Sequence, residues 1–285
     1  MSRKVVLPSN LDALWQALFD HPEAQLFAGG TDLLVKMRSG LVCPLTLIGL
    51  ERIEALRQVE DQGETIFIGA ACTHESLLNE PLIRKHFPVL VKGLQVLGSP
   101  LVRRMGTIGG NLITASPAGD TLPPLYVLEA DLELRKRDSL RYLPITDFIR
   151  GPGQTVLESG EILSGVRLKK QPGGMIHHFE KVGLRKALAI AVVSLAAILD
   201  ISKNGIVREA HLAWGSLGPT VVTCREAETA LEGRILSRET LERAAARVRS
   251  AASPIDDLRA GADYRRQVAG NLLMRLLAPV PQPLS

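Results

Sequence analysis

The stretch MGTIGGNLITASPAGD, Met105 to Asp120, carries a Gly-Gly pair two residues after a threonine. An earlier stretch, LFAGGTDLL from Leu26 to Leu34, carries a Gly-Gly pair directly before a threonine. Each pair has a polar neighbour, Asp32 in the first stretch and Asn111 in the second. Neither stretch has the GxGxxG spacing of a Rossmann fingerprint or the GxxxxGK[ST] spacing of a P-loop. The two stretches therefore need a different explanation.

Glycines at a tight turn let successive backbone N–H groups approach an anion, because no Cβ atom stands in the way. A neighbouring threonine adds a hydroxyl donor. Two such loops in one chain are typical of a clamp for a diphosphate, whereas a single loop is more typical of a turn that only reverses the chain. Spacing alone leaves both interpretations open.

The composition is that of an ordinary folded protein. Apolar residues make up 46% and charged residues 22% of the 285 residues, close to the average for globular domains. This length exceeds one average domain of roughly 100–200 residues, so we expect two domains. Aromatic residues make up only 4%, and the net charge of +4 is not gathered into blocks. The low aromatic content argues against a nucleic-acid-binding protein, because single-strand binders stack bases on aromatic side chains. The spread of the charges argues the same way, because blocks of basic residues are typical of nucleic-acid-binding segments.

We expect a cytoplasmic protein without a membrane span. No apolar stretch of signal-peptide type follows the basic residues of MSRKVVLPSN. The longest apolar run, Ala187 to Leu199, is shorter than the roughly 20 residues that cross a bilayer and predicts buried core. Cys43, Cys72 and Cys224 are isolated and too few for a four-cysteine iron–sulfur or zinc site. We therefore expect any such centre to belong to a partner chain.

Capping residues and periodicity predict mixed helices and strands in the N-terminal part. Ser9 is the expected cap of a first helix, and Thr73 the expected cap of another. Pro117, Gly119, Pro123 and Pro124 are expected to interrupt regular structure. Further helix is expected over 89–97, strands over 44–50, 65–71, 131–135 and 162–168, and short elements over 24–28 and 33–37.

The segment Gln171-Pro172-Gly173-Gly174 is the best linker in the chain and the predicted domain boundary. Beyond it, the apolar runs 187–199 and 206–215 predict two strands joined at Lys203-Asn204-Gly205, since Asn-Gly suits a hairpin turn. Amphipathic patterns predict helices over 237–252 and 263–278. We expect an α+β fold with domains 1–172 (subdomains of about 1–55 and 56–172) and 173–285.

The two glycine stretches, taken in order, resemble the flavin-binding middle subunit of the molybdenum hydroxylases, the group that contains bacterial xanthine dehydrogenase and carbon monoxide dehydrogenase. The likeness continues through SGEIL at Ser159 to Leu163, FEKVGLRKALAIA at Phe179 to Ala191, and IDDLRAGADYRRQVAGNLLMRLL near the end. It implies a two-subdomain FAD-binding fold similar to that of vanillyl-alcohol oxidase, followed by a smaller α+β C-terminal domain.

The resemblance also implies which residues bind FAD. The first loop, whose main-chain N–H groups wrap the diphosphate, comprises Leu26, Phe27, Ala28, Gly29, Gly30, Thr31, Asp32 and Leu33. The second loop comprises Thr107, Ile108, Gly109, Gly110 and Asn111. Further implied positions at the cofactor are Thr114, Asp120, Leu163 and Lys181. An ionised Asp120 would accept hydrogen bonds from sugar hydroxyls, and Lys181 would offset negative charge on the reduced flavin.

Other polar residues have plainer interpretations. His177 and His178 are neighbours on an expected strand and point to opposite faces, so one metal ion can hardly bind both. His74 could be imagined as an attachment site for covalent flavin, but a polar residue at a helix start explains it. Arg103 and Arg104 either steer a partner or acceptor or form an exposed charged pair. We expect no catalytic residue and no metal ligand in this chain.

The function that the resemblance implies is electron transfer. FAD in this chain would take electrons from the [2Fe-2S] clusters of a small subunit, which receive them from the molybdopterin centre of a large subunit. The acceptor would be NAD, oxygen or another compound, and the assembly a dimer of heterotrimers. The hydroxybenzoyl-CoA reductase version is disfavoured, because its extra cysteine-rich insertion is missing here.

Two alternatives remain at this point. A stand-alone flavin-dependent reductase or oxidase of the same fold would need its own substrate domain with a catalytic Ser or Cys and a Glu, which the C-terminal segment does not obviously offer. A flavin-free scaffold subunit is disfavoured by the intact glycines and by Thr31, Thr107 and Asp120.

Overall fold

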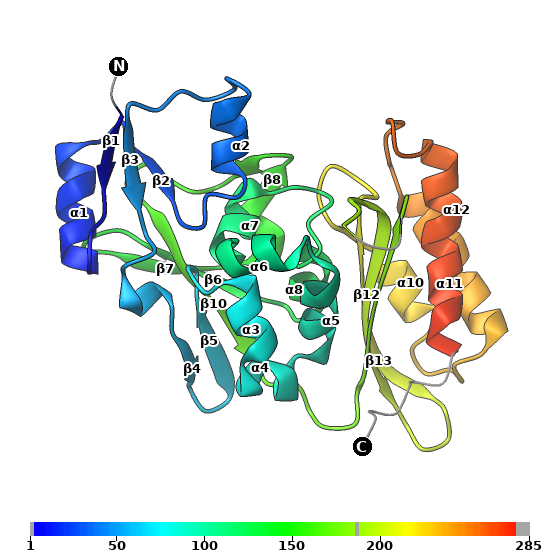
Figure 1. Ribbon diagram of the computed structural model, residues 1–285. Coiled ribbons are helices and arrows are strands. Elements are labelled where there is room, and N and C mark those ends of the chain that lie inside the picture. The colour runs from blue at the N-terminus through cyan, green and yellow to red at the C-terminus, as the bar shows by residue number, and fades with distance from the viewer. Residues whose placement is uncertain (1–2, 186–187, 278–285) are drawn as a thin grey trace. The chain divides into compact units, whose positions relative to one another are not determined.

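The computed structural model describes residues 3–185 and 188–277. Its elements form two compact units (Figure 1). Unit 1 contains Met1–Ile83, Gly98–Ser116 and Glu129–Lys170, and unit 2 contains Arg84–Leu97, Pro117–Leu128 and Gln171–Ser285. The last change of unit along the chain therefore falls at the Pro-Gly-rich linker.

Unit 1 begins with a parallel sheet in the order β1-β3-β2, formed by Lys4–Val6, Thr46–Gly49 and Gln25–Phe27. Helix α1 (Leu11–Asp20) buries Leu14 and Trp15 in a core that also contains Ile48 of β3. Its cap is Asn10, whose side chain accepts a hydrogen bond from the N–H of Ala13. The prediction that Ser9 caps this helix was wrong by one residue. Asparagine and serine are equally good caps, so the sequence does not decide between them.

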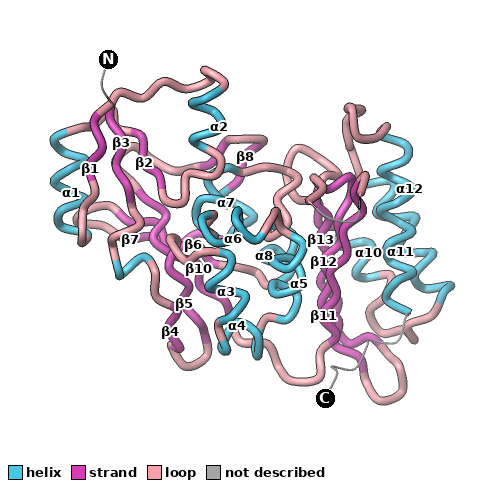
Figure 2. Tube along the Cα trace, viewed as in Figure 1, coloured by secondary structure: helices cyan, strands magenta, loops and turns pink. Residues whose placement is uncertain are grey.

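The second sheet of unit 1 is antiparallel, in the order β4-β5-β10-β6-β7. Its strands are labelled among the magenta segments of Figure 2. The central strand β10 pairs with β5 on one side and with β6 on the other. The expected strands over 65–71, 131–135 and 162–168 are confirmed. The five strands are Val59–Asp61, Thr65–Gly69, Ile162–Lys169, Asp131–Arg135 and Leu140–Pro144.

Short helices and a small hairpin complete unit 1. Thr73 caps α3 as expected, by accepting from the N–H of Ser76. The second glycine pair is not a loop: Gly109 and Gly110 lie in the first turn of α7, which Thr107 caps. The elements are α2 (Leu33–Arg38), 3-10 helix η1 (Glu54–Leu56), α3 (His74–Asn79), α6 (Pro100–Met105), α7 (Ile108–Thr114), α9 (Ile145–Phe148), β8 (Ile149–Gly151) and β9 (Gln154–Thr155). Helix α4 (Pro81–His86) runs from unit 1 into unit 2.

Unit 2 is built on an antiparallel sheet in the order β11-β12-β13-β14, formed by Ile176–Gly183, Ala191–Ile201, Val207–Gly215 and Val222–Thr223. The expected Asn-Gly hairpin joins β12 to β13, and Gly205 has the positive φ of 77° that such a turn needs. Nine successive residues of β12 are buried, because helices pack on both faces of the sheet.

Helices α5 (Pro88–Val96) and α8 (Leu122–Val127) lie on one face of this sheet (Figure 1). The expectation that Pro123 and Pro124 interrupt regular structure was wrong, because both belong to the first turn of α8. The N–H groups of a first turn have no partner within the helix, so the missing N–H of proline costs no hydrogen bond there. The other face carries α10 (Arg225–Thr229), α11 (Arg238–Ala251), α12 (Ala262–Leu272) and the 3-10 helix η2 (Leu273–Leu277). Ala187 and Ala278, the expected ends of a strand and a helix, lie outside the described residues.

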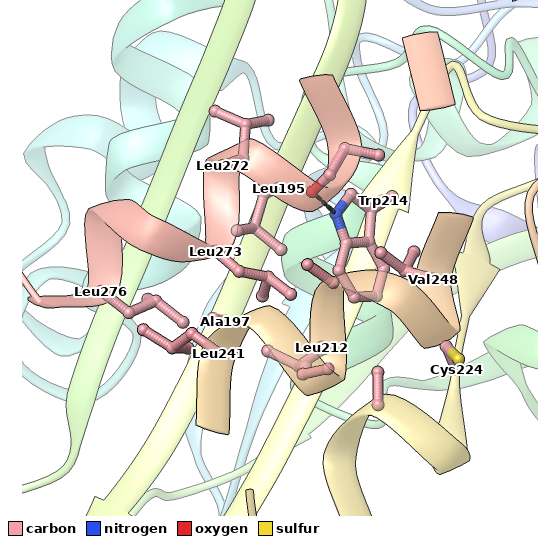
Figure 3. Close-up of a cluster of buried hydrophobic side chains, with 14 of the residues drawn as sticks. Leu195, Ala197, Leu212, Trp214, Cys224, Leu241, Val248, Leu272, Leu273 and Leu276 are labelled. Atoms are coloured by element: carbon pink, nitrogen blue, oxygen red, sulfur yellow. Dashed lines mark hydrogen bonds between the residues drawn. The ribbon is translucent and has the colours of Figure 1, made fainter. Parts of the chain in front are cut away.

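The core of unit 2 lies between the sheet and α11 and α12 (Figure 3). At its centre the fully buried Trp214 of β13 donates its indole N–H to the carbonyl of Ala269, at 3.2 Å. Leu195, Leu241 and Leu273 belong to the same cluster and are fully buried. This core fixes the sheet from which Lys181 of β11 projects.

Candidate functional site

Unit 1 contains a cavity of about 360 Å³. Seven of the residues that the sequence predicted for cofactor binding line it, and they come from both glycine stretches and from β10. They are Leu26, Phe27, Ala28, Thr107, Gly109, Gly110 and Leu163. Residues more than 50 positions apart in sequence thus meet around one space.

The remaining wall of the cavity is mostly apolar, and the site residues predicted from the sequence did not include it. It is formed by Leu18, Pro22, Ala24, Gln25, Leu50, Ala70, Ala71, Ile113, Leu157, Ser159, Gly160, Glu161 and Ile162. Ser159 to Leu163 is the SGEIL stretch, so that part of the wall had a sequence signal. Apolar walls with a few polar groups are typical of small-molecule and cofactor sites.

The first glycine loop presents unused hydrogen-bond donors. Within the described part of the chain, no protein acceptor receives the N–H groups of Gly29, Gly30, Thr31 or Asp32. Gly30 has a φ of 69°, in the left-handed region that favours glycine. Consecutive N–H groups around a left-handed residue form the kind of concavity that binds anions.

Gly29 has a different role, because it touches the second glycine stretch. A Cβ atom at Gly29 would lie 1.6 Å from the carbonyl oxygen of Met105. Met105 ends α6, and Gly106 beside it lies next to the hydroxyl of Thr31. The absence of a side chain at Gly29 therefore sets the distance between the two stretches.

Replacing Gly29 with alanine is expected to destabilise the protein by about 1–3 kcal/mol, since one backbone segment must move to admit the methyl group. Urea unfolding followed by circular dichroism measures this change. Gly173→Ala is the matched control, because its Cβ would meet nothing within 4 Å. Equal stability of the two variants would contradict the assigned contact with Met105.

The second glycine stretch uses its own N–H groups within the chain. Ile108 donates to the carbonyl of Cys72 at 3.0 Å, Gly109 to the carbonyl of Ala70 at 2.8 Å, and Gly110 to the hydroxyl of Thr107 at 3.1 Å. The expected clamp of N–H groups from both stretches is thus available only from the first. The second stretch offers the bare Cα of Gly110 at the cavity wall.

Asp32 and Thr114 bind each other. The Thr114 hydroxyl donates to Asp32 Oδ2 at 3.3 Å, and Lys36 Nζ lies 2.7 Å from the same oxygen. This contact ties the end of α7 to the first loop. Of the remaining predicted residues in unit 1, Ile108 is fully buried and Asn111 and Leu33 are half-buried.

Asp120 and Lys181 form an ion pair inside unit 2. Lys181 Nζ lies 2.7 Å from Asp120 Oδ2 and donates to the carbonyl of Val96 at 2.9 Å. The two side chains are only 10% and 8% exposed, and Asp120 Oδ1 is buried without a hydrogen-bond partner. Burial raises the pKa of Asp120 to about 6, although Lys181 opposes the shift. The pair therefore holds an unused acceptor, which is the feature that a bound hydroxyl or N–H group would satisfy.

This pKa gives a stability prediction for the protein without cofactor. A carboxyl group in the unfolded chain titrates near 3.9, so the folded chain binds the extra proton between that value and about 6. Because the folded state binds this proton more tightly, its free energy of unfolding rises as the pH falls from about 7 to 4. Relative to Asp120→Asn, which has no carboxyl group to titrate here, the rise is up to about 3 kcal/mol. Urea unfolding of both proteins at pH 7.5 and 4.5 tests this. A stability difference independent of pH would contradict the raised pKa.

The other polar residues singled out in the sequence do not line the cavity. Arg103 Nε lies 3.4 Å from Glu75 Oε2, and Arg104 is exposed. His74 begins α3 as expected but is buried, and burial together with Arg103 lowers its pKa to about 4. His177 and His178 lie on β11, and burial lowers the pKa of each to about 4.

The described residues contain no group of three or more His, Cys, Asp and Glu side chains placed to hold a metal ion. None of their helices is long and apolar enough to cross a membrane.

Comparison with known proteins identifies the family. The protein-family model for the FAD binding domain in molybdopterin dehydrogenase matches residues 1–169. The family model for the CO dehydrogenase flavoprotein C-terminal domain matches residues 178–280. The chain belongs to this family of molybdopterin-dehydrogenase flavoproteins, which confirms the resemblance seen in the sequence. It is thus an FAD-binding dehydrogenase subunit of the xanthine and carbon monoxide dehydrogenase type.

This chain aligns with most of the length of several known proteins. The nicotinate dehydrogenase FAD-subunit of Eubacterium barkeri is 33% identical over 226 residues, 78% of this chain and 76% of the relative. The carbon monoxide dehydrogenase medium chain of Hydrogenophaga pseudoflava is 29% identical, over 90% of this chain and 88% of the relative. Among solved structures, quinoline 2-oxidoreductase from Pseudomonas putida 86 superposes with a TM-score of 0.92 at 27% identity, covering 97% of this chain and 96% of the other.

Proposed function

We propose that this chain is the FAD-carrying electron-transfer subunit of a molybdenum hydroxylase. The observation that carries the proposal is the cavity of unit 1, lined by both glycine stretches and by Leu163. A scaffold subunit without flavin has no need for this space or for the free N–H groups beside it. No observation favours a stand-alone reductase.

The residues present fit FAD. The free N–H groups of Gly29 to Asp32 suit the diphosphate, because they are donors without protein partners. The apolar wall around Leu26 and Leu163 suits a flat heteroaromatic group. In unit 2, the unpartnered Oδ1 of Asp120 suits a donor of the cofactor, and Lys181 suits negative charge. The remaining predicted residues of unit 1 support the two glycine stretches in this proposal; they are Leu33, Ile108, Asn111 and Thr114.

Bound FAD supplies the chemistry of taking up electrons one at a time and giving them up in pairs. The residues of this chain bind and orient it. Lys181 holds a positive charge beside Asp120 and the carbonyl of Val96, where it would stabilise added negative charge. No protein acid or base is needed for electron transfer, so we assign no catalytic residue.

The proposed electron source is a pair of [2Fe-2S] clusters on a small partner subunit, fed by molybdopterin on a large one. The relatives named as medium chains and FAD subunits support the existence of such partners. NAD or oxygen is the proposed acceptor, and a dimer of heterotrimers in the cytoplasm the proposed assembly. For residues 1–172 and 173–285 we propose an FAD-binding domain similar to vanillyl-alcohol oxidase and a smaller C-terminal domain.

The test is to denature the purified chain, separate the released small molecule by chromatography and identify it by mass, beside the visible spectrum of the native protein. About one FAD per chain, without iron or molybdenum, is the expected result. A chain that binds no FAD even after incubation with it would overturn the proposal. Co-purification with chains that carry molybdenum and iron tests the proposed partners separately.

A further inference from the structure

Ser216 lies directly after β13, and all three of its hydrogen-bonding groups are used. Its N–H donates to the carbonyl of Pro117 at 2.8 Å, and its hydroxyl donates to the carbonyl of Ala191 at 3.0 Å. Its own carbonyl accepts from Arg265 Nη1 at 3.2 Å. The residue is 6% exposed. Ser216 therefore joins the ends of two strands, α12 and the segment that begins at Pro117, all within unit 2.

The backbone of Ser216 has a φ of 61°, in the left-handed region that a serine rarely occupies. Such a conformation costs of order 1–3 kcal/mol and persists only where the surrounding structure holds it. In this conformation the N–H faces Pro117 while the hydroxyl reaches Ala191. Strained residues of this kind cluster at functional sites.

Arg265 fixes the carbonyl end of Ser216. Its side chain is 2% exposed, and Nη1 also donates to the carbonyl of Val192 at 3.1 Å. Asp257 Oδ1 accepts from Arg265 Nη2 at 2.6 Å, which supplies the opposite charge that a buried guanidinium requires. The carbonyl groups of Val192 and Ser216 are thus fixed by one guanidinium.

The segment that Ser216 holds carries Asp120 three residues further on. Gly215, next to Ser216, leaves room for the same segment: a Cβ there would lie 3.1 Å from Pro123 and 3.5 Å from the carbonyl of Pro117. On its other side, Gly93 of α5 lies close to the carbonyl oxygen of Asp120. The segment is therefore hydrogen-bonded at Pro117 and packed against Gly93 at Asp120, the residue that forms the ion pair with Lys181.

We propose that Ser216 is a positioning residue for the Asp120 carboxylate: its hydroxyl, bonded to the carbonyl of Ala191, holds the left-handed backbone in which its N–H donates to the carbonyl of Pro117. The inference rests on the proposed binding of FAD and names a further residue on which that binding depends. Ser216 itself touches no cofactor in this assignment, and Arg265 acts through it.

A double-mutant cycle on FAD affinity tests the proposal. The proteins are the wild type, Ser216→Ala, Asp120→Asn and the double variant, titrated with FAD after removal of bound cofactor. Ser216→Ala keeps the N–H but removes the hydroxyl bond to Ala191 that holds this backbone. It is therefore expected to raise the Kd of FAD about tenfold, the effect of one lost hydrogen bond. In the Asp120→Asn background the same substitution is expected to have no further effect, because sites that act as one unit are not additive.

Ser202→Ala is the matched control. The Ser202 hydroxyl also makes one hydrogen bond, from the N–H of Ile206 at 3.0 Å, at the opposite end of the β12–β13 hairpin. It is expected to shift the unfolding midpoint about as much as Ser216→Ala while leaving the Kd of FAD unchanged. If Ser216→Ala does not fold, Ser216→Gly replaces it, since glycine also lacks the hydroxyl bond to Ala191 and adds no strain at a positive φ.

The outcomes are distinguishable. If the wild type binds FAD and Ser216→Ala has an unchanged Kd, the positioning role is overturned while the proposed function stands. An equal rise in Kd with and without Asp120 would also overturn it, because a general structural effect is additive. A wild type that binds no FAD would overturn the proposed function and this inference together.

Discussion

Replacing Gly110 with leucine is expected to raise the Kd of FAD at least about 100-fold, or about 2.7 kcal/mol of binding free energy, while leaving the fold intact. Gly110 lines the cavity, and a Cβ there would meet only the hydroxyl of Thr107, at 2.9 Å. A leucine side chain would therefore extend into the space that FAD needs. The Thr107 hydroxyl must shift slightly, but leucine is a better helix former than glycine, so we expect the first turn of α7 to persist.

FAD titration by quenching of flavin fluorescence, beside thermal unfolding, measures both halves of this expectation. Gly173→Leu is the control, because it adds the same side chain where nothing lies within 4 Å. Unchanged FAD affinity in Gly110→Leu would place the cofactor elsewhere and contradict the assignment of the cavity. Loss of the folded state would instead show that the hydroxyl of Thr107 cannot yield.

The parts of the fold that were predictable are those set by local chemistry. Thr73 caps its helix and Asn204-Gly205 turns its hairpin because these residue types favour those geometries wherever they occur. The errors at Ser9 and at Pro123 and Pro124 are also local, since a sequence pattern allows more than one start for a helix. The error at the second glycine pair arises where tertiary packing decides. Gly109 and Gly110 form a helical turn, against their propensity, because Thr107 caps it and the backbone of Gly109 packs on Ala70. No local pattern carries that contact.

The candidate site divides in the same way. The glycine stretches were visible because their composition is unusual, and the resemblance extended them to Asp120 and Lys181. The ion pair itself joins residues 61 positions apart, and its sequence neighbours give no sign of it. Likewise, the contact of Gly29 with the carbonyl of Met105 gives that glycine a packing role, whereas the sequence suggested either anion binding or a turn that only reverses the chain.

The largest expected effect on stability comes from Trp214, which is fully buried at the centre of the unit 2 core. Replacing it with alanine is expected to lower the free energy of unfolding by about 3–5 kcal/mol, since a large cavity remains where the indole was. The carbonyl of Ala269 also loses its donor. Urea unfolding followed by circular dichroism measures the change.

Trp214→Phe keeps an aromatic ring in the core but lacks the five-membered ring of the indole, including the N–H that Ala269 accepts, so most of the cavity of Trp214→Ala is avoided. Its expected cost is the smaller one of about 1–3 kcal/mol for a buried acceptor left unpaired. Trp214 lies two residues before Ser216 on the same chain segment. If Trp214→Phe destabilises the protein without changing the Kd of FAD, while Ser216→Ala changes it, then core packing and cofactor positioning are separate properties of this strand end. If both variants weaken FAD binding in proportion to their lost stability, the strand end acts only through the stability of unit 2.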